Sequence, residues 1–445
     1  MVEKAELAAL TAIEAAEIIA GGDMSAEDYV GACLERIEAI DGEVHAFIHL
    51  DPGEALKQAR ALDDRRRNGK ALGPLHGVPV AIKDIFDTAD YPTECGSPML
   101  KGRRPMRDCM AVARLKEAGA VIIGKSVTTE FAYFHPGATR NPRDLERTPG
   151  GSSSGSAATV AAGMVPLAIG SQTNGSVIRP AAFCGVYGCK PTHGTISRHG
   201  ALILSQALDH VGVFARSLAD TALILEVLAG YDAQDSDTRP VASPAFLENV
   251  DAEPPMTPRF AFVQTPVWDK ADAATRAAIE GLVARLGEQA QPITLGESFA
   301  AAWDDHRAIM SVDMAHHLKP VLERGEAVSS KALRDFLVEG TKVPAVRYLA
   351  ALDAAKRYGN GIAEIFKDYD AIITPAAPGV APKGEATGNP VFCSLWTLTG
   401  LPALSLPLLT GEGDMPLGVQ LIGERGDDAR LLRTANWLVA KLAEG

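Results

Sequence analysis

Apolar residues recur at helical spacing through the first part of the chain. Residues 4–20 and 25–40 each carry an apolar stripe and are predicted to form amphipathic helices. Ser25 with Asp28 three residues later is typical of a helix N-cap with a capping-box-like start. A third helix is predicted over 52–67, because it opens on a proline and proline is favoured at the first helical position.

Short apolar runs rich in β-branched residues follow and alternate with further helical patterns. Strands are predicted at VPVAIK (ending at Lys83), 120–124, 259–263 and 371–374 and near Leu404 and Val419, and helices at 108–118 and 217–230. This alternation predicts an α/β fold with a central mixed β-sheet flanked by helices on both faces.

The stretch 272–368 is predicted to be mostly helical. It carries bulky side chains, which ordinary helix packing explains, although a cap over an active site is an alternative: Trp303, Met310, Met314, Phe336, Tyr348 and Tyr358. Strand patterns resume after it, so one domain over 1–445 is expected. Its parts are N-terminal helices (1–68), a core (69–230), a variable and mostly helical region (231–370), and a return to the sheet (371–445).

Composition narrows the function classes. Of the 445 residues, 47% are hydrophobic, which is ample for a large core, and the net charge of −13 disfavours nucleic acid or an anionic membrane as a partner. The sequence has no run of 18 apolar residues and no signal-peptide pattern at its start, so a soluble, cytoplasmic protein is expected. Its six cysteines lack zinc-site spacing and are predicted to be buried free thiols. His316-His317 is better explained by packing or surface exposure than by a metal, and neither metal nor cofactor is expected.

Two Gly/Ser clusters, 150–156 and 170–176, flank the uncharged segment AATVAAGMVPLAI. Glycine-bracketed loops joined by buried structure bring hydroxyls and free backbone N–H groups to one point. A flexible linker is disfavoured, because some fifteen apolar and small residues follow the first cluster directly. A nucleophile elbow with Ser153 fits G-x-S-x-G formally. That motif follows a hydrophobic strand, however, and here the charged DLERTP precedes it.

A serine nucleophile needs a base, and no histidine lies in either cluster or beside VPVAIKD. Lys83 ends this apolar strand, and burial can lower a lysine pKa by several units, which makes the amine a candidate base. A surface lysine at a strand end is the alternative.

GGSSSGSAA, GSQTNGSVIRPAA and the upstream GVPVAIKD together resemble the amidase signature family, most closely its bacterial malonamidase-type members. The signature spans about Leu75 to Pro191, and similar stretches recur in YDAIITPAAP and TLTGLPALSLP. The resemblance implies the amidase signature fold and a Ser–cis-Ser–Lys triad. In that triad Ser176 is the nucleophile, Ser152 is the bridging serine after a cis peptide bond, and Lys83 is the base.

The resemblance also implies an oxyanion hole built from backbone N–H groups of Thr173, Asn174, Gly175 and Ser176. The family usually has glycine where this chain has Asn174, and the asparagine side chain is expected to narrow the site. Arg179 contacts the substrate carboxylate in malonamidase-like relatives and supports the loop in others, so both roles stay open.

The predicted function is that of a serine amidohydrolase without cofactor. It is expected to act on small amides, aryl amides or carbamates (urethanes) through an acyl-enzyme, with urethanase or esterase side activity. The bulky residues of 300–360 favour apolar aryl or alkyl substrates over malonamate. Two alternatives stay open, the glutaminase subunit of a tRNA-dependent amidotransferase and a histidine-dependent α/β-hydrolase esterase. The expected partner is a small-molecule amide or carbamate, without nucleic acid or membrane, and a homodimer is left open.

Overall fold

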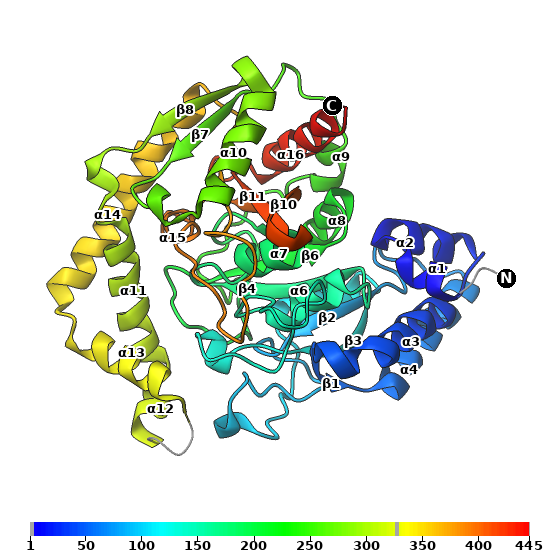
Figure 1. Ribbon diagram of the computed structural model, residues 1–445. Helices are drawn as coiled ribbons and strands as arrows, with labels where there is room; N and C mark the ends of the chain where they lie inside the picture. The colour runs from blue at the N-terminus through cyan, green and yellow to red at the C-terminus, as the bar shows by residue number, and fades with distance from the viewer. Residues whose placement is uncertain (1–3, 325–328, 445) are drawn as a thin grey trace.

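One mixed β-sheet organises the chain (Figure 1). The computed structural model describes residues 4–324 and 329–444, and the sheet in these ranges has 11 strands in the order β1-β3-β2-β4-β6-β5-β10-β11-β9-β7-β8. The strands are β1 (Phe47–Leu50), β2 (Pro79–Lys83), β3 (Val121–Ser126), β4 (Leu167–Gln172), β5 (Tyr187–Lys190), β6 (His210–Ala215), β7 (Phe260–Gln264), β8 (Ala290–Thr294), β9 (Ala371–Pro375), β10 (Ala403–Thr410) and β11 (Pro416–Ile422). Strand β2 pairs in parallel with β3 and β4, and β7 pairs in parallel with β8 and β9, whereas the other pairs are antiparallel.

Helices flank this sheet, as predicted for the α/β class. They are α1 (Lys4–Ala9), α2 (Ala12–Gly21), α3 (Ala26–Val44), α4 (Pro52–Arg67), α5 (Met110–Glu117), α6 (Ser154–Ala161), α7 (Ile178–Cys184), α8 (Leu218–Leu228), α9 (Phe246–Val250), α10 (Ala273–Leu286), α11 (Ala302–His317), α12 (Lys319–Arg324), α13 (Lys331–Lys342), α14 (Ala345–Ala363), α15 (Ser394–Leu398) and α16 (Asp428–Ala443). The N-terminal helices α1–α4 lie on one side of the molecule and α11–α14 on the opposite side (Figure 1).

Local signals predicted several boundaries correctly. Ser25 caps α3 by accepting a hydrogen bond from the Asp28 N–H at 2.9 Å, and α4 spans the predicted 52–67. The single helix predicted for 4–20 is in fact two, because Thr11 interrupts it and caps α2 with a capping box to Glu14.

The stretch 272–368 is less uniformly helical than predicted. It contains β8, an edge strand with a largely exposed pattern that pairs only with β7. Such a short, polar-faced strand has no periodicity of its own and is defined by its neighbour. Together with β7 it extends the sheet from within the region 231–370, while the division into one domain remains a prediction.

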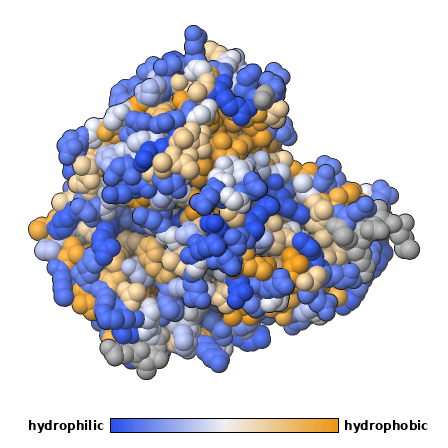
Figure 2. All heavy atoms as spheres, viewed as in Figure 1, coloured by the Kyte–Doolittle hydropathy of each residue, from blue (hydrophilic) through white to orange (hydrophobic). Residues whose placement is uncertain are grey.

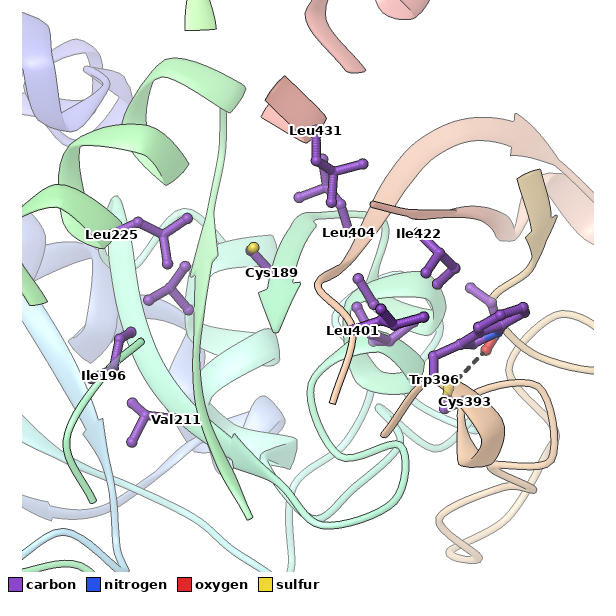
Figure 3. Close-up of a cluster of buried hydrophobic side chains, with 14 of the residues drawn as sticks. Cys189, Ile196, Val211, Leu225, Cys393, Trp396, Leu401, Leu404, Ile422 and Leu431 are labelled. Carbon is purple, nitrogen blue, oxygen red and sulfur yellow. Dashed lines mark hydrogen bonds between the residues drawn. The ribbon is translucent and has the colours of Figure 1, made fainter. Parts of the chain in front are cut away.

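The core beneath the second half of the sheet is continuous and apolar. Figure 3 shows Leu225, Leu404, Ile422, Trp396 and Leu431, from α8, β10, β11, α15 and α16, gathered in one cluster. Trp396 is 1% exposed, so the short helix α15 is anchored firmly in this core.

All six cysteines are buried free thiols, as predicted. Within 4–324 and 329–444, no group of three or more His, Cys, Asp or Glu gathers as a metal site. In the same ranges no helix has both the length and the apolar character needed to cross a bilayer. The face in Figure 2 is mainly polar, with apolar residues scattered between.

Candidate active site

The carboxyl ends of β2 and β4 bring the first two side chains of the site together. Both strands carry the sequence V-P-x-A-I, and the parallel pairing sets Ile82 opposite Ile169. Lys83 and Ser171, which follow these isoleucines closely, therefore reach the same edge of the sheet, where Lys83 Nζ lies 2.8 Å from Ser171 Oγ.

Ser152 is the second hydroxyl on Lys83. Lys83 Nζ and Ser152 Oγ are 2.7 Å apart, and the peptide bond between Gly151 and Ser152 is cis, as the sequence resemblance implied. Glycine is required before this serine because the backbone approaches its neighbours closely. A Cβ at Gly151 would lie 2.8 Å from Thr387 Cγ2 and 3.0 Å from Thr129 Cγ2.

Lys83 is fully buried, so a surface lysine at a strand end is the wrong interpretation. Burial lowers the pKa of its ammonium to about 7, and the charges of Asp209 and Cys95 oppose that shift. A large fraction of the amine is therefore neutral near neutral pH and has a lone pair for a proton.

Ser176 and Ser152 line one cavity. The other lining residues come from the second Gly/Ser cluster, from α7, from the segment between β3 and α6 and from the C-terminal half: Ala132, Tyr133, Phe134, Thr173, Asn174, Gly175, Arg179, Met310, Thr387 and Pro390.

Ser153 does not line this cavity. It is fully buried, and its hydroxyl lies 3.3 Å from both the N–H and the carbonyl oxygen of Ser171. Its hydrogen bonds fix the two Gly/Ser clusters to each other. The nucleophile-elbow hypothesis therefore has no support in the geometry.

The turn before Ser176 lines the cavity and has consecutive backbone donors without a protein partner in the described chain. The N–H groups of Asn174, Gly175 and Ser176 donate to no protein acceptor in the described residues. Glycine is needed at 175, because a Cβ there would lie 2.8 Å from Pro390 Cβ. The Asn174 side chain is tied to α15, where its Oδ1 accepts a hydrogen bond from Ser394 Oγ at 2.7 Å.

Arg179 is a buried cation without a full set of partners. It is 2% exposed, and its Nη2 donates to the Gly151 carbonyl at 2.6 Å. Its Nε and Nη1 have no hydrogen-bond partner in the described structure, and burial lowers the pKa of the guanidinium to about 10. Its Cζ lies 5.8 Å from the ring centroid of Phe134. A buried guanidinium with free donors favours an anionic ligand.

The prediction that bulky residues of the region 300–360 line the site is mostly wrong. Of the six bulky residues named for this region, only Met310 lines the cavity. The Trp303 indole N–H donates to the Val391 carbonyl at 2.7 Å, and the Tyr348 hydroxyl donates to Asp313. Phe336 stacks on Tyr133 at 4.8 Å between ring centroids. Trp303 and Phe336 thus join the helical region to segments beside the cavity, and Tyr348 joins α14 to α11, so none of the three forms the binding surface itself.

Sequence reasoning missed Ser171, His306 and Thr397. The shared V-P-x-A-I pattern of β2 and β4 could have revealed Ser171, because it puts the two strand ends side by side. No sequence signal marks His306 or Thr397, since each reaches the turn before Ser176 from a distant helix, His306 to the Thr173 carbonyl and Thr397 to the Asn174 carbonyl.

In this α/β fold a buried lysine amine therefore meets serine hydroxyls at a strand end. A protein-family model described as Amidase matches residues 28–432. The chain belongs to this amidase family, as its sequence resemblance implied.

Individual relatives are similar over nearly the whole chain. A glutamyl-tRNA(Gln) amidotransferase subunit from Chloroflexus aggregans is 37% identical, covering 97% of this chain and 96% of that protein. A chain from a vestigial protein complex, described as revealing the evolutionary origins of an s-triazine catabolic enzyme, superposes with a TM-score of 0.90 at 31% identity, covering 97% of this chain and 98% of that one. The peptide amidase of Stenotrophomonas maltophilia has a TM-score of 0.82 at 28% identity, covering 97% of each chain.

Proposed function

We propose that this chain hydrolyses the C–N bond of a small amide that carries a carboxylate, with Ser176 as the nucleophile. The observation that carries the proposal is the contact of Lys83 with Ser152, 2.7 Å apart, at the wall of the cavity that Ser176 shares. Family membership and the amidase relatives support the reaction class.

In the proposed mechanism, the neutral Lys83 amine accepts the proton of Ser152 while Ser152 accepts that of Ser176. Ser171 Oγ accepts a hydrogen bond from the same amine, and this bond orients the lone pair of the amine. Ser176 Oγ then bonds to the amide carbon, the C–N bond breaks, and the proton returns through Ser152 to the leaving amine. Water repeats the sequence on the acyl-enzyme and releases the acid.

The activity is expected to rise with pH through neutrality. Since the lowered pKa of Lys83 is about 7, only the deprotonated form is a base and kcat/KM increases between pH 6 and pH 8. One pH unit below this pKa, roughly one tenth of the plateau rate is expected. The measurement is a pH profile of kcat/KM on a slow amide, for which chemistry limits the rate. A flat profile from pH 6 to 9 would contradict the lysine base.

The free donors of Arg179 are the reason for proposing a substrate that carries a carboxylate. Its two free nitrogens are donors in a buried cavity wall, and no acidic residue lines the cavity within the described chain. A substrate carboxylate would supply the missing anion through charge-assisted hydrogen bonds. We therefore propose the opposite of the apolar preference expected from the sequence.

Arg179→Met is expected to lower kcat/KM for malonamate about 100-fold, the size expected for losing charge-assisted hydrogen bonds. Isovaleramide, which has an isopropyl group in place of the carboxylate, serves as the matched control substrate and corrects for any disturbance of the Gly151 carbonyl that Arg179 also holds. The measured quantity is the malonamate/isovaleramide ratio in each protein. An unchanged ratio refutes carboxylate binding by Arg179.

A second candidate is the glutaminase component of a tRNA-dependent amidotransferase, and the relatives favour it over a stand-alone amidase. The Chloroflexus amidotransferase protein matches across 96% of its own length, and glutamine is a small primary amide with a carboxylate. The absence of an acidic residue from the cavity lining in the described chain argues the other way, because the ammonium group of glutamine would have no carboxylate partner there.

Ammonia or amine release from glutamine, malonamate, isovaleramide, an anilide and a carbamate tests these candidates. The assay uses the purified chain, with its mass in solution measured in parallel. Malonamate turnover exceeding that of glutamine by the chain alone supports the stand-alone amidase. Glutamine preferred over malonamate, or activity only with a partner protein, supports the glutaminase hypothesis. Turnover of none of the amides, with or without a partner, overturns the proposal.

A further inference from the structure

The turn from Thr173 to Ser176 presents its N–H groups to the cavity only if its carbonyls face away. In a trans peptide unit the C=O and the following N–H point in opposite directions. The orientation of the Asn174, Gly175 and Ser176 donors is therefore set by whatever binds the carbonyls of Thr173, Asn174 and Gly175.

Each of these three carbonyls has a hydrogen-bond donor. The Gly175 carbonyl accepts from the Arg179 N–H at 3.0 Å, within the start of α7. The Asn174 carbonyl accepts from Thr397 Oγ1 at 2.6 Å. The Thr173 carbonyl accepts from His306 Nε2 at 2.9 Å. One restraint is thus local, and the other two come from helices far along the chain.

The restraint by Thr397 is rigid because its helix is anchored in the core. Thr397 lies on α15 next to Trp396, which Figure 3 shows packed among the buried apolar side chains. Thr397 Oγ1 also accepts a hydrogen bond from Gln172 Nε2 at 2.9 Å, while Gln172 Oε1 accepts from the Val177 N–H at 2.9 Å.

His306 comes from α11, outside the segments that resemble the family signature. Its side chain is 2% exposed, and one helical turn later Met310 lines the cavity, so this face of α11 meets the site. A carbonyl oxygen only accepts, so Nε2 carries the proton and donates. Burial lowers the pKa of His306 to about 4, so the imidazole is neutral and a poor base near pH 7.

We propose that His306 is a positioning residue for the oxyanion hole, holding the Thr173–Asn174 peptide so that the Asn174 N–H faces the reacting carbonyl. The inference rests on the proposed function only in requiring acyl transfer at Ser176. Without the imidazole, the Thr173 carbonyl loses its partner and this peptide is free to rotate, turning one donor away. Loss of one oxyanion donor typically lowers the rate about 10²–10³-fold.

His306→Leu is expected to lower kcat on the best amide about 100-fold and to change KM less than about threefold, because the donor acts on the transition state. His306→Gln, whose amide N–H reaches a similar position, is expected to recover most of the loss. The inflection of the pH profile stays near 7 in both variants, because Lys83 sets it. A lost inflection, an equal rise in KM, or no rescue by glutamine overturns the positioning role.

Leu337→Ala is the matched control for a loosened helix. Leu337 is fully buried on α13, which packs against α11, and it does not line the cavity. This variant is expected to lower the melting temperature while kcat stays within about twofold of wild type. If it lowers kcat as much as His306→Leu does, the effect is general loosening and the proposal is wrong.

Labelling by a fluorophosphonate separates failure of this inference from failure of the substrate proposal, since the reagent needs the oxyanion hole but no particular amide. The wild type is expected to label at Ser176, and His306→Leu about 100-fold more slowly. Equal labelling rates overturn the inference even if malonamate proves to be the substrate. Labelling that is slowed in this way upholds it even if no tested amide is turned over, and failure of the wild type to label at Ser176 overturns both.

Discussion

Ser176→Ala is expected to lower kcat/KM on any amide substrate by at least about 10³-fold while the fold stays intact. Removing the nucleophile of an acyl-transfer enzyme eliminates the covalent route and leaves only the binding and oxyanion contributions. Ser176 lines the cavity and is only partly buried, so the melting temperature should change little. Kinetics and circular dichroism on the purified variant test both statements.

Ser153→Ala serves as the control, because Ser153 belongs to the same cluster but is bonded to the Ser171 backbone. It is expected to reduce stability by about 1 kcal/mol and to retain measurable acyl-transfer activity. Retention of more than about a tenth of the wild-type rate by Ser176→Ala, with loss in Ser153→Ala, would contradict the assignment and favour the nucleophile elbow.

Lys83→Met is expected to lower kcat/KM about 10³-fold or more and to abolish the rise in activity between pH 6 and 8. The replacement is apolar and of similar length, so it fits a fully buried site and removes a group whose burial already disfavours its charge. The folded state should therefore survive. The measurement is the pH profile of the residual activity together with thermal unfolding.

Lys190 offers a matched control lysine. It is also fully buried, burial lowers its pKa to about 7, and its Nζ donates to backbone carbonyls of Pro191 and Leu401 instead of serine hydroxyls. Lys190→Met is expected to keep the inflection near pH 7. If Lys190→Met removes that inflection while Lys83→Met preserves it, the wrong lysine has been assigned as the base.

Local sequence determined much of the fold, because caps, prolines and apolar periodicity act over a few residues. Ser25 and Pro52 marked helix starts that the structure contains, and VPVAIK formed the predicted buried strand. The same local signals failed at β8, whose residues form a strand only because β7 lies beside them.

The site residues likewise fall into those that contiguous motifs suggest and those that only contacts between distant segments reveal. The two Gly/Ser clusters and the lysine at the end of an apolar strand are contiguous motifs. The sequence could therefore propose Lys83 as a base, and the family resemblance singled out Ser152 and Ser176 among the serines. The structure places Lys83 against Ser152. Only the tertiary structure decided that Arg179 keeps two free donors, that the bulky residues of 300–360 mostly pack away from the cavity, and that His306 holds the Thr173 carbonyl. Each of these depends on contacts between segments distant in the chain, and side-chain periodicity carries no information about which distant partner a buried polar group will find.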